Sequence, residues 1–303
     1  MYTVDLSLIE LGIHEELVAY VADQQDYYAE EGAHVALRDG RTWNHDRLRR
    51  TATIGLGRAL VFAVTGGVPW VVLCVNTQHP LFWLLARESF TTVEALEGRR
   101  IGVHEPRTGP GCFARIVLRK HGLDPDRDVQ CVVMTPGNYG RHLRALVDGS
   151  LDAAFVGSTV APEVAARENG LRLLAFMGDD LQVPTVGIAV DPTHVSPDDP
   201  AVRALVRAHR RALRAIHDDP DLAVRCVNAL LPCLTSAQAR QHYERYVAPY
   251  FTTDGRHDPS VAARALSAVA EELAAPTVPD STTLYRTQPP EEKSWPTPSE
   301  WRS

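Results

Sequence analysis

Short apolar runs alternate with longer amphipathic stretches along most of the chain. Residues 70–76 and 153–156 are nearly continuous apolar runs with the length of buried strands, whereas apolar residues recur at helical spacing through residues 15–31. Gly32 follows that stretch, in the position where glycine commonly ends a helix. Strands that alternate with helices predict an α/β fold whose sheets are mostly parallel.

The order of the predicted elements divides the chain into two blocks. Strands are expected at residues 2–10, 34–38, 53–56, 70–76 and 82–87 of the first block and at residues 100–104, 129–134, 153–156 and 171–177 of the second. Residues 186–191 return to the first block, and helices at residues 200–217, 220–231, 236–247 and 259–274 pack back onto it. We therefore expect one lobe of residues 1–88 and 186–275 and a second of residues 89–185. Residues 276–303, rich in Pro, Ser, Thr and Glu, form a tail that either follows the surface or is disordered.

Composition narrows the classes of partner. The 303 residues are 45% hydrophobic and 23% charged, which is ordinary for a globular protein with two domains. A formal net charge of −7 argues against a nucleic-acid surface, because phosphate binding needs a basic face. No run of 18 apolar residues is present, so no membrane span is expected. The five cysteines form no CxxC pair, which favours reduced thiols over disulfides or a zinc site, and no metal is expected.

The N-terminal segment bears on the compartment. It lacks the basic start, the continuous apolar stretch and the cleavage site of a signal peptide. If Met1 is the natural start, we expect a cytoplasmic protein. If it is not, we expect a periplasmic or other extracytoplasmic one, and only then a transporter permease as partner.

Four segments carry a resemblance to a known family. They are residues 19–35, with an aromatic pair, an acidic residue and glycine before a strand; residues 96–103, LEGRRIGV; residues 121–125, HGLDP; and residues 145–154, ALVDGSLDAA. In this order they resemble the type II periplasmic-binding-protein superfamily, the fold of the substrate-binding proteins of ABC transporters. The branch that they resemble most binds nitrate, sulfonates, taurine and thiamine-pyrimidine precursors.

The resemblance implies a two-lobed α/β fold with a ligand cleft between the lobes, and a small organic ligand that is more often anionic. The same branch contains a thiamine-pyrimidine synthase and an aryl sulfinate desulfinase. The synthase holds pyridoxal phosphate on a lysine after the third strand, where residues 55–61 here contain no lysine. The desulfinase carries a cysteine in the first loop, where residues 11–15 contain none. We therefore expect no cofactor and neither of these two mechanisms.

The loops that follow the strands are the candidate ligand contacts, because ligands of such folds lie beyond the carboxyl ends of the strands. His14 follows the first strand and is either a ligand contact or a surface histidine beside Glu15. Gly57 and Arg58 follow the third strand, where they either clamp an acidic group or form a turn with a solvated arginine. Two further candidates are His45, before that loop, and His79, which serves equally well as part of a hinge.

The strongest local signal is the loop at residues 104–112, where a strand ends and a helix begins. Free N–H groups at a helix N-terminus bind anions. The same environment is expected to lower the pKa of the Cys112 thiol, although a cysteine here also packs well in a core. The candidate ligand contacts of this loop are His104, Arg107, Thr108, Gly109, Gly111 and Cys112.

The last candidates lie in the second block. Ser158 or Thr159 is expected to cap the helix that follows, and a hydroxyl here is also placed to meet a ligand. Tyr139 is a candidate aromatic lid. Four other histidines, expected to face solvent on arginine-rich helices, are His142, His209, His217 and His242.

Two functions remain open from the sequence. The first is a binding protein whose lobes close on a small polar or anionic organic molecule. The second is a cytosolic enzyme that uses the same cleft, such as a decarboxylase, a desulfinase or another lyase. Its candidate catalytic residues are His14, His45 and Cys112, although no pair of nucleophile and base is evident.

Overall fold

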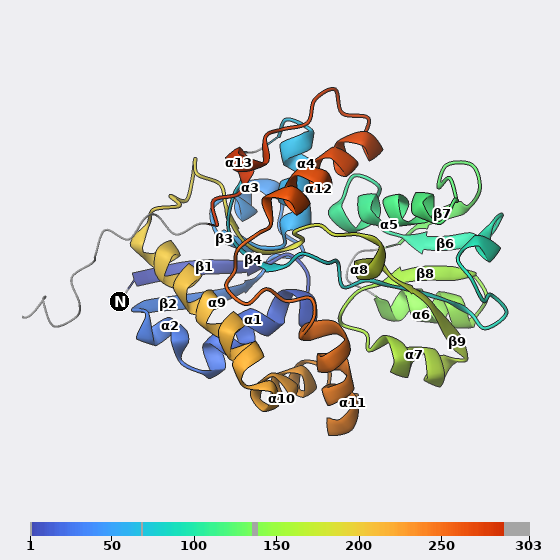
Figure 1. The fold of residues 1–303 in the computed structure, drawn as a ribbon, viewed down its shortest axis with the longest axis horizontal. Helices are drawn as coiled ribbons and strands as arrows, with labels where there is room; N and C mark the ends of the chain where they lie inside the picture. Colours follow the sequence, from blue (N-terminus) through green and yellow to red (C-terminus); the bar gives the residue numbers. More distant parts are fainter. Residues whose placement is uncertain (1, 68, 135–138, 288–303) are drawn as a thin grey trace, which may run out of the picture.

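Two five-stranded sheets lie side by side along the long axis of the molecule in the computed structural model (Figure 1). The structure describes residues 2–67, 69–134 and 139–287. The strand order is β2-β1-β3-β10-β4 in the first sheet and β7-β6-β8-β5-β9 in the second. Each sheet with the helices that cover it forms one lobe.

The strands of the two sheets pair in the same way. The first sheet contains β1 (Tyr2–Leu8), β2 (Ala33–Asp39), β3 (Ala52–Ile54), β4 (Val71–Thr77) and β10 (Val186–Val190). The second contains β5 (Trp83–Arg87), β6 (Arg100–Val103), β7 (Gln130–Val133), β8 (Ala153–Val156) and β9 (Leu171–Phe176). The single strand that runs against the others is β10 in the first sheet and β5 in the second. The prediction of mostly parallel sheets is confirmed.

The chain crosses from the first lobe to the second before β5 and returns before β10. Strand β5 therefore belongs to the second sheet, where Trp83 pairs with Val156 of β8 and with Phe176 of β9. The sequence analysis placed residues 82–87 in the first block, and this placement was wrong. A short apolar run looks the same in either sheet, so hydrophobic periodicity could not assign it.

The helices of the first lobe come from both ends of the chain. From the N-terminal part come α1 (Ile13–Gln24), α2 (Tyr27–Glu30), α3 (His45–Leu48) and α4 (Leu56–Val64). From the C-terminal part come α9 (Pro200–Asp218), α10 (Pro220–Leu230), α11 (Ser236–His242), the π-helical turn η2 (Tyr243–Val247), α12 (Pro259–Glu272) and α13 (Ser281–Leu284). Helix α9 packs against α1, β1 and β4, and α12 packs against α4, so that the C-terminal third completes the first lobe.

The second lobe has a continuous stretch of chain. Its helical elements are η1 (Glu94–Leu96), α5 (Gly109–Lys120), α6 (Tyr139–Val147), α7 (Pro162–Asn169) and α8 (Met177–Asp180). Pro162 opens α7 and Gly170 ends it in the left-handed conformation, as proline and glycine do at helix ends. No helix of the described chain is long and apolar enough to cross a membrane.

The first part of the C-terminal tail lies on the first lobe. Leu284 and Tyr285 are buried, and Tyr285 forms a parallel bridge to Val72 of β4. Of the two predicted alternatives, residues 276–287 therefore follow the surface. The rest of the predicted tail lies outside the described residues.

Helix α4 begins earlier than the sequence pattern predicts. The backbone N–H of Leu56 donates to the carbonyl of Thr185, 2.7 Å away, at the end of the return crossing. Gly57 and Arg58 consequently lie in the first turn of a helix and not in a turn after the strand.

Candidate functional site

The carboxyl ends of β1, β3, β6 and β8 face the boundary between the lobes, beside the two crossing segments. These segments hydrogen-bond to each other: Val183 N–H donates to the carbonyl of Gln78 at 2.8 Å, and Thr185 N–H to that of Thr77 at 3.2 Å. The loops that leave the strands therefore meet where the chain itself bridges the lobes.

His14 is buried in this boundary, with 2% of its surface exposed. Its Nε2 lies 2.8 Å from Thr77 Oγ1 and 2.9 Å from Thr185 Oγ1, one hydroxyl from each crossing segment. Its Nδ1 has no hydrogen-bond partner among the described residues. Burial lowers the pKa of His14 to about 3, so the ring is neutral at physiological pH. The alternative of a surface histidine is therefore wrong.

Ser158 of the second lobe caps helix α1 of the first. Its Oγ accepts the backbone N–H of His14 at 2.9 Å, and its carbonyl accepts that of Ile13 at 3.2 Å. The sequence analysis expected Ser158 or Thr159 to cap the following helix, and this was wrong. Helix α7 begins after Ala161 without a side-chain cap, and Thr159 is exposed. The N-terminus of α1 is thus satisfied across the lobe boundary.

Carboxyl groups gather beside His14. Glu15 is 6% exposed, and its Oε1 lies 3.6 Å from His14 Nδ1, beyond hydrogen-bond distance. Burial raises the pKa of Glu15 well above its ordinary value, and the charges of Glu10 and Glu16 raise it further. Glu10, itself partly buried, also has a raised pKa because of burial. The sequence analysis treated Glu15 only as a neighbour of His14.

Aromatic rings close the other side of this group. Phe82, from the first crossing segment, lies with its ring centroid 6.3 Å from that of His14 and 6.1 Å from that of His104. Tyr139 Oη is 3.2 Å from His104 Nε2, and both residues are buried. The Tyr139 ring lies directly on Gly157, where an added Cβ would approach it to 2.7 Å. Burial raises the pKa of Tyr139, and the charges of Glu10 and Glu15 contribute, which places the ring near these carboxyl groups.

A second contact joins the lobes through glycines. A Cβ added to Gly109, at the start of α5, would lie 2.7 Å from Gly57 Cα at the start of α4. Glu272 of α12 reinforces this contact by pairing with Arg115 at 2.5 Å and with Arg119 at 2.9 Å. Gly57 and Gly109 therefore bring two helix N-termini together across the boundary.

Arg58 lies apart from His14. Within the described part of the chain it makes no hydrogen bond or ion pair, and burial lowers its pKa. Its charge acts instead on His45, whose pKa is lowered by burial first and by Arg58 second. The His45 ring stands edge-on to Phe62 with 4.1 Å between centroids. The structure thus groups Arg58 with His45, and neither joins the cluster around His14.

Cys112 is a core residue. Its exposed fraction is 0%, and burial raises the pKa of its thiol to about 12. The expected lowering of this pKa by the helix N-terminus was wrong, because desolvation outweighs the dipole. The thiol is accordingly protonated and a poor nucleophile.

The other candidates of that loop have structural roles or point outward. Thr108 caps α5, its Oγ1 accepting the N–H of Gly111 at 3.3 Å. Gly111 has no room for a side chain, since an added Cβ would lie 2.0 Å from the carbonyl oxygen of Glu105. Arg107 is exposed. His79 contacts the return crossing through Nδ1, 2.6 Å from the carbonyl of Gly178, in agreement with a hinge position.

Three of the four histidines expected on the surface are buried. His142 and His209 are 0% exposed and His242 is 4% exposed, so the expectation was wrong for these three. Nε2 of His209 lies 2.9 Å from Tyr28 Oη, inside the first lobe. These rings lie on inward helix faces between arginines that point outward, which a count of charged neighbours does not reveal.

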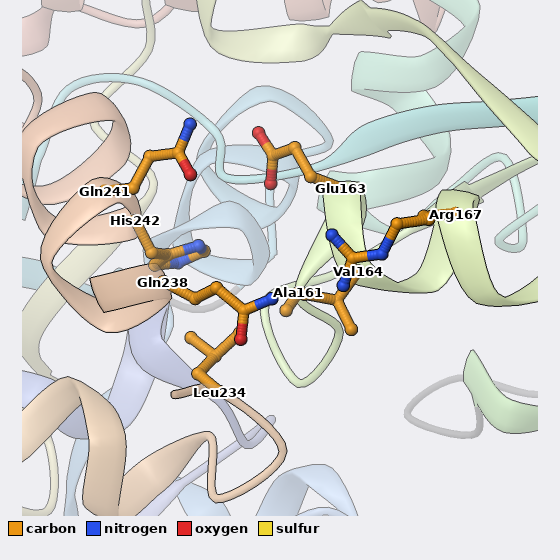
Figure 2. Close-up of a pocket in the computed structure, with 8 residues that line it drawn as sticks. All are labelled: Ala161, Glu163, Val164, Arg167, Leu234, Gln238, Gln241 and His242. Atoms are coloured by element: carbon orange, nitrogen blue, oxygen red, sulfur yellow. The ribbon is translucent and has the colours of Figure 1, made fainter. Parts of the chain in front are cut away.

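A cavity of about 30 Å³, close to the volume of one water molecule, lies between α7 and α11 (Figure 2). His242 lines it, and neither ring nitrogen has a hydrogen-bond partner among the described residues. The cavity is too small for an organic ligand. Across the described residues no group of three or more His, Cys, Asp or Glu side chains is placed to hold a metal ion.

Four residues of the cluster were not singled out individually from the sequence, although Thr77 and Thr185 lie in two of the loops at residues 76–80 and 182–185 that the sequence offered as weaker candidates. Glu15 and Phe82 lie next to two candidate loops in the sequence, but neither type of residue indicates a ligand contact by itself. Thr77 and Thr185 lie 108 positions apart, and their hydroxyls meet at 3.1 Å only because the two crossings run side by side.

The comparisons with known proteins agree with this architecture. The periplasmic aliphatic sulphonate binding protein SsuA from Escherichia coli superposes with a TM-score of 0.72 at 15% identity, covering 98% of this chain and 96% of that one. A Candida albicans gene product described as having the generic periplasmic binding protein fold gives 0.73 at 14% identity, with 95% and 97% covered. The desulfurization enzyme DSZB gives 0.65 at 16% identity, with 94% and 93% covered.

At these identities the solved structures establish the fold, which is the two-lobed fold of periplasmic binding proteins. A family model establishes the relationship. The model described as "NMT1/THI5 like" matches residues 15–223, more than half of the chain, and its match spans both sheets. The chain therefore belongs to the NMT1/THI5-like family.

Proposed function

We propose that this protein binds a small organic molecule between its lobes and closes over it. The observation that carries the proposal is the capping of helix α1 by Ser158 from the opposite lobe. A hydrogen-bonded contact of this kind forms only when the lobes are closed. Opening or closing of the lobes therefore breaks or makes hydrogen bonds at the groups that line the boundary.

Opening would expose polar groups that have few other partners. His14 Nδ1, the Glu15 carboxyl and the N–H groups of Ile13 and His14 would all become accessible on the first lobe. The second lobe would carry away Ser158, Tyr139 and His104. A ligand bound to the first lobe would then be enclosed as the second lobe returned, with the crossing segments at residues 78–82 and 177–185 as the hinge. We therefore propose that each of the two sheets, with its helices, moves as one lobe.

The structural neighbours include both a binding protein and an enzyme. The Escherichia coli neighbour is a sulphonate-binding protein by its name, and DSZB is a desulfurization enzyme. Of the three candidate catalytic residues, His14 and Cys112 are poorly prepared for proton transfer or attack at neutral pH, because their pKa values are about 3 and about 12. Ligand binding is therefore the function that the site supports best.

A thermal-shift and calorimetry screen tests the proposal. The panel holds sulfonates, sulfinates, aromatic acids, pyrimidines and amines, and mass spectrometry follows each hit for chemical change. A ligand at about 100 times its Kd should raise the free energy of unfolding by about 2.7 kcal/mol. The His14→Ala variant should bind the hit at least about tenfold more weakly, whereas Asp23→Asn, an exposed position on the same helix, should not.

Three outcomes would contradict the proposal. A panel without any stabilising ligand would remove its basis. Equal affinity in the wild type and in His14→Ala would place the ligand elsewhere. A hit that is consumed would mean that the cleft is an active site.

A further inference from the structure

The chemistry of the buried group around His14 bears on what kind of ligand enters. Glu15 and His14 are consecutive residues in the first turn of α1, and both are buried. Because 3.6 Å separates Oε1 from Nδ1, the two groups do not satisfy each other. His14 Nδ1 has no hydrogen-bond partner among the described residues, and the Glu15 carboxyl lies beside it. Groups of this kind call for a hydrogen-bond donor.

The surrounding charges have the same sign. The carboxyl groups of Glu10 and Glu16 act on Glu15, and both raise its pKa. Arg41 acts on Glu10 and Glu16, but it is itself paired with Asp39 at 2.8 Å. Arg58, the cation expected from the sequence to hold an acidic ligand, acts on His45 instead. A cation placed beside Glu15 would favour the ionised carboxylate, whereas an anion would disfavour it further.

The aromatic residues near this group also favour a cation. Phe82 and Tyr139 lie 6.4 Å apart between ring centroids, and Phe82 also lies against the His14 ring. The faces of aromatic rings attract cations and exclude water from them. His14 and His104 are neutral and do not repel a positive charge. A carboxyl group with aromatic walls is a common arrangement for enclosing an organic cation.

We propose that the interlobe site takes an organic amine or amidine, whose protonated head donates to the Glu15 carboxylate and to His14 Nδ1 while Phe82 and Tyr139 enclose it. This inference rests on the proposed function and replaces the anionic ligand expected from the sequence. On binding, the Glu15 carboxyl releases its proton to solvent, and the ligand's N–H groups donate to the carboxylate that remains. The ligand keeps its own proton and no covalent bond changes.

Isothermal titration with three probes of similar shape tests the inference: benzamidine, which is cationic, benzamide, which is neutral, and benzenesulfonate, which is anionic. The wild type should bind benzamidine at least tenfold more tightly than either of the others. Glu15→Gln keeps the shape of the side chain, so it should fold, and it should reduce this preference to less than threefold. Asp23→Asn removes one charge from an exposed position of the same helix and should leave the preference unchanged.

The titration has a second readout that a structural role of Glu15 would not change. Repeated at pH 7 in buffers of different ionisation enthalpy, it should show up to one proton released for each benzamidine bound to the wild type. Glu15→Gln should release none.

Three results would overturn the inference. They are tighter binding of benzenesulfonate than of benzamidine, an unchanged preference in Glu15→Gln, and failure of the wild type to bind benzamidine at all. A sulfonate that binds and closes the lobes, as measured by small-angle scattering, would overturn this inference while leaving the proposed function intact. A screen without any ligand would instead remove the proposed function.

Discussion

The two lobes share one strand order but use it differently at their boundary. β1 occupies in the first sheet the place that β6 has in the second, and β3 corresponds in the same way to β8. The loop after β1 meets the loop after β8, through His14 and Ser158. The loop after β3 meets the loop after β6, through Gly57 and Gly109. The two contacts are therefore counterparts of each other, related by the repeated topology.

Their chemistry differs completely. The first contact is built from buried polar side chains, carboxyl groups and a capped helix N-terminus, all of which can exchange partners. The second is a close approach of two glycine backbones at the N-termini of α4 and α5. We infer that the two equivalent contacts have different roles. The contact of His14 with Ser158 recognises the ligand, and the contact of Gly57 with Gly109 sets how closely the lobes approach.

The largest effect should come from the glycine contact. Gly109→Val places a branched side chain against Gly57 Cα, where even a Cβ would approach to 2.7 Å. Overpacking of this kind costs about 1–3 kcal/mol, which corresponds to a loss of about fivefold to 150-fold in ligand affinity if the strain is relieved by opening. Small-angle scattering should show a larger radius of gyration. An unchanged radius with unchanged affinity would mean that this contact does not limit closure, and Arg107→Ala, on an exposed neighbour, serves as the control.

Acid should lower the free energy of unfolding through His104, which belongs to the polar contact. His104 has a pKa of about 4 in the folded protein and about 6.5 when unfolded, so the unfolded chain binds more protons between these values. Stability is full above pH 6.5 and falls by up to about 1.4 kcal/mol for each pH unit down to about 4. Glu15, with a raised pKa, acts in the opposite direction. Urea unfolding at pH 7, 6 and 5 should give a smaller slope for His104→Gln than for the wild type, and equal slopes would refute the burial argument.

Ser158→Ala should have a smaller effect. It removes the Oγ that accepts the N–H of His14 across the boundary. A helix cap of this kind contributes about 1 kcal/mol, so ligand affinity should fall about fivefold. Thr159→Ala removes a hydroxyl from the adjacent, exposed position and should change affinity by less than twofold. Calorimetry on both variants would distinguish the loss of the cap from the loss of any hydroxyl group in this loop. Equal affinities in the two variants would exclude a contribution of the cap to ligand binding.

Most of the fold was predictable because its signals are local. The predicted segment at residues 153–156 matches β8, and the prolines at residues 200, 220 and 259 begin α9, α10 and α12 as expected. The assignment of β5 to a sheet failed because it depends on pairing between distant strands.

The site was predictable only in its outline. The rule that ligand loops follow strands selected His14, His104, Tyr139 and Ser158, and the structure gathers these four in one buried group. It could not reveal that Ser158 caps a helix of the other lobe, because that bond spans 144 positions. It also could not predict the pKa of Cys112, because a helix N-terminus lowers this pKa and burial raises it, and the sequence does not show which effect is larger.

The smallest effect should come from an ion pair at the edge of the boundary. Glu163 of α7 accepts from Arg245 at 2.8 Å and from Tyr246 Oη at 2.6 Å, which links the second lobe to the helices after α10. Arg245 is about half exposed, with 51% of its side chain accessible, and such pairs contribute about 0–1 kcal/mol. Glu163→Gln keeps an acceptor for Tyr246, so ligand affinity should fall by less than about fivefold, and the difference from the wild type should vanish in 1 M salt because exposed charges are screened there. A loss that persists in high salt would show that this edge, and not only the two loop contacts, holds the lobes together.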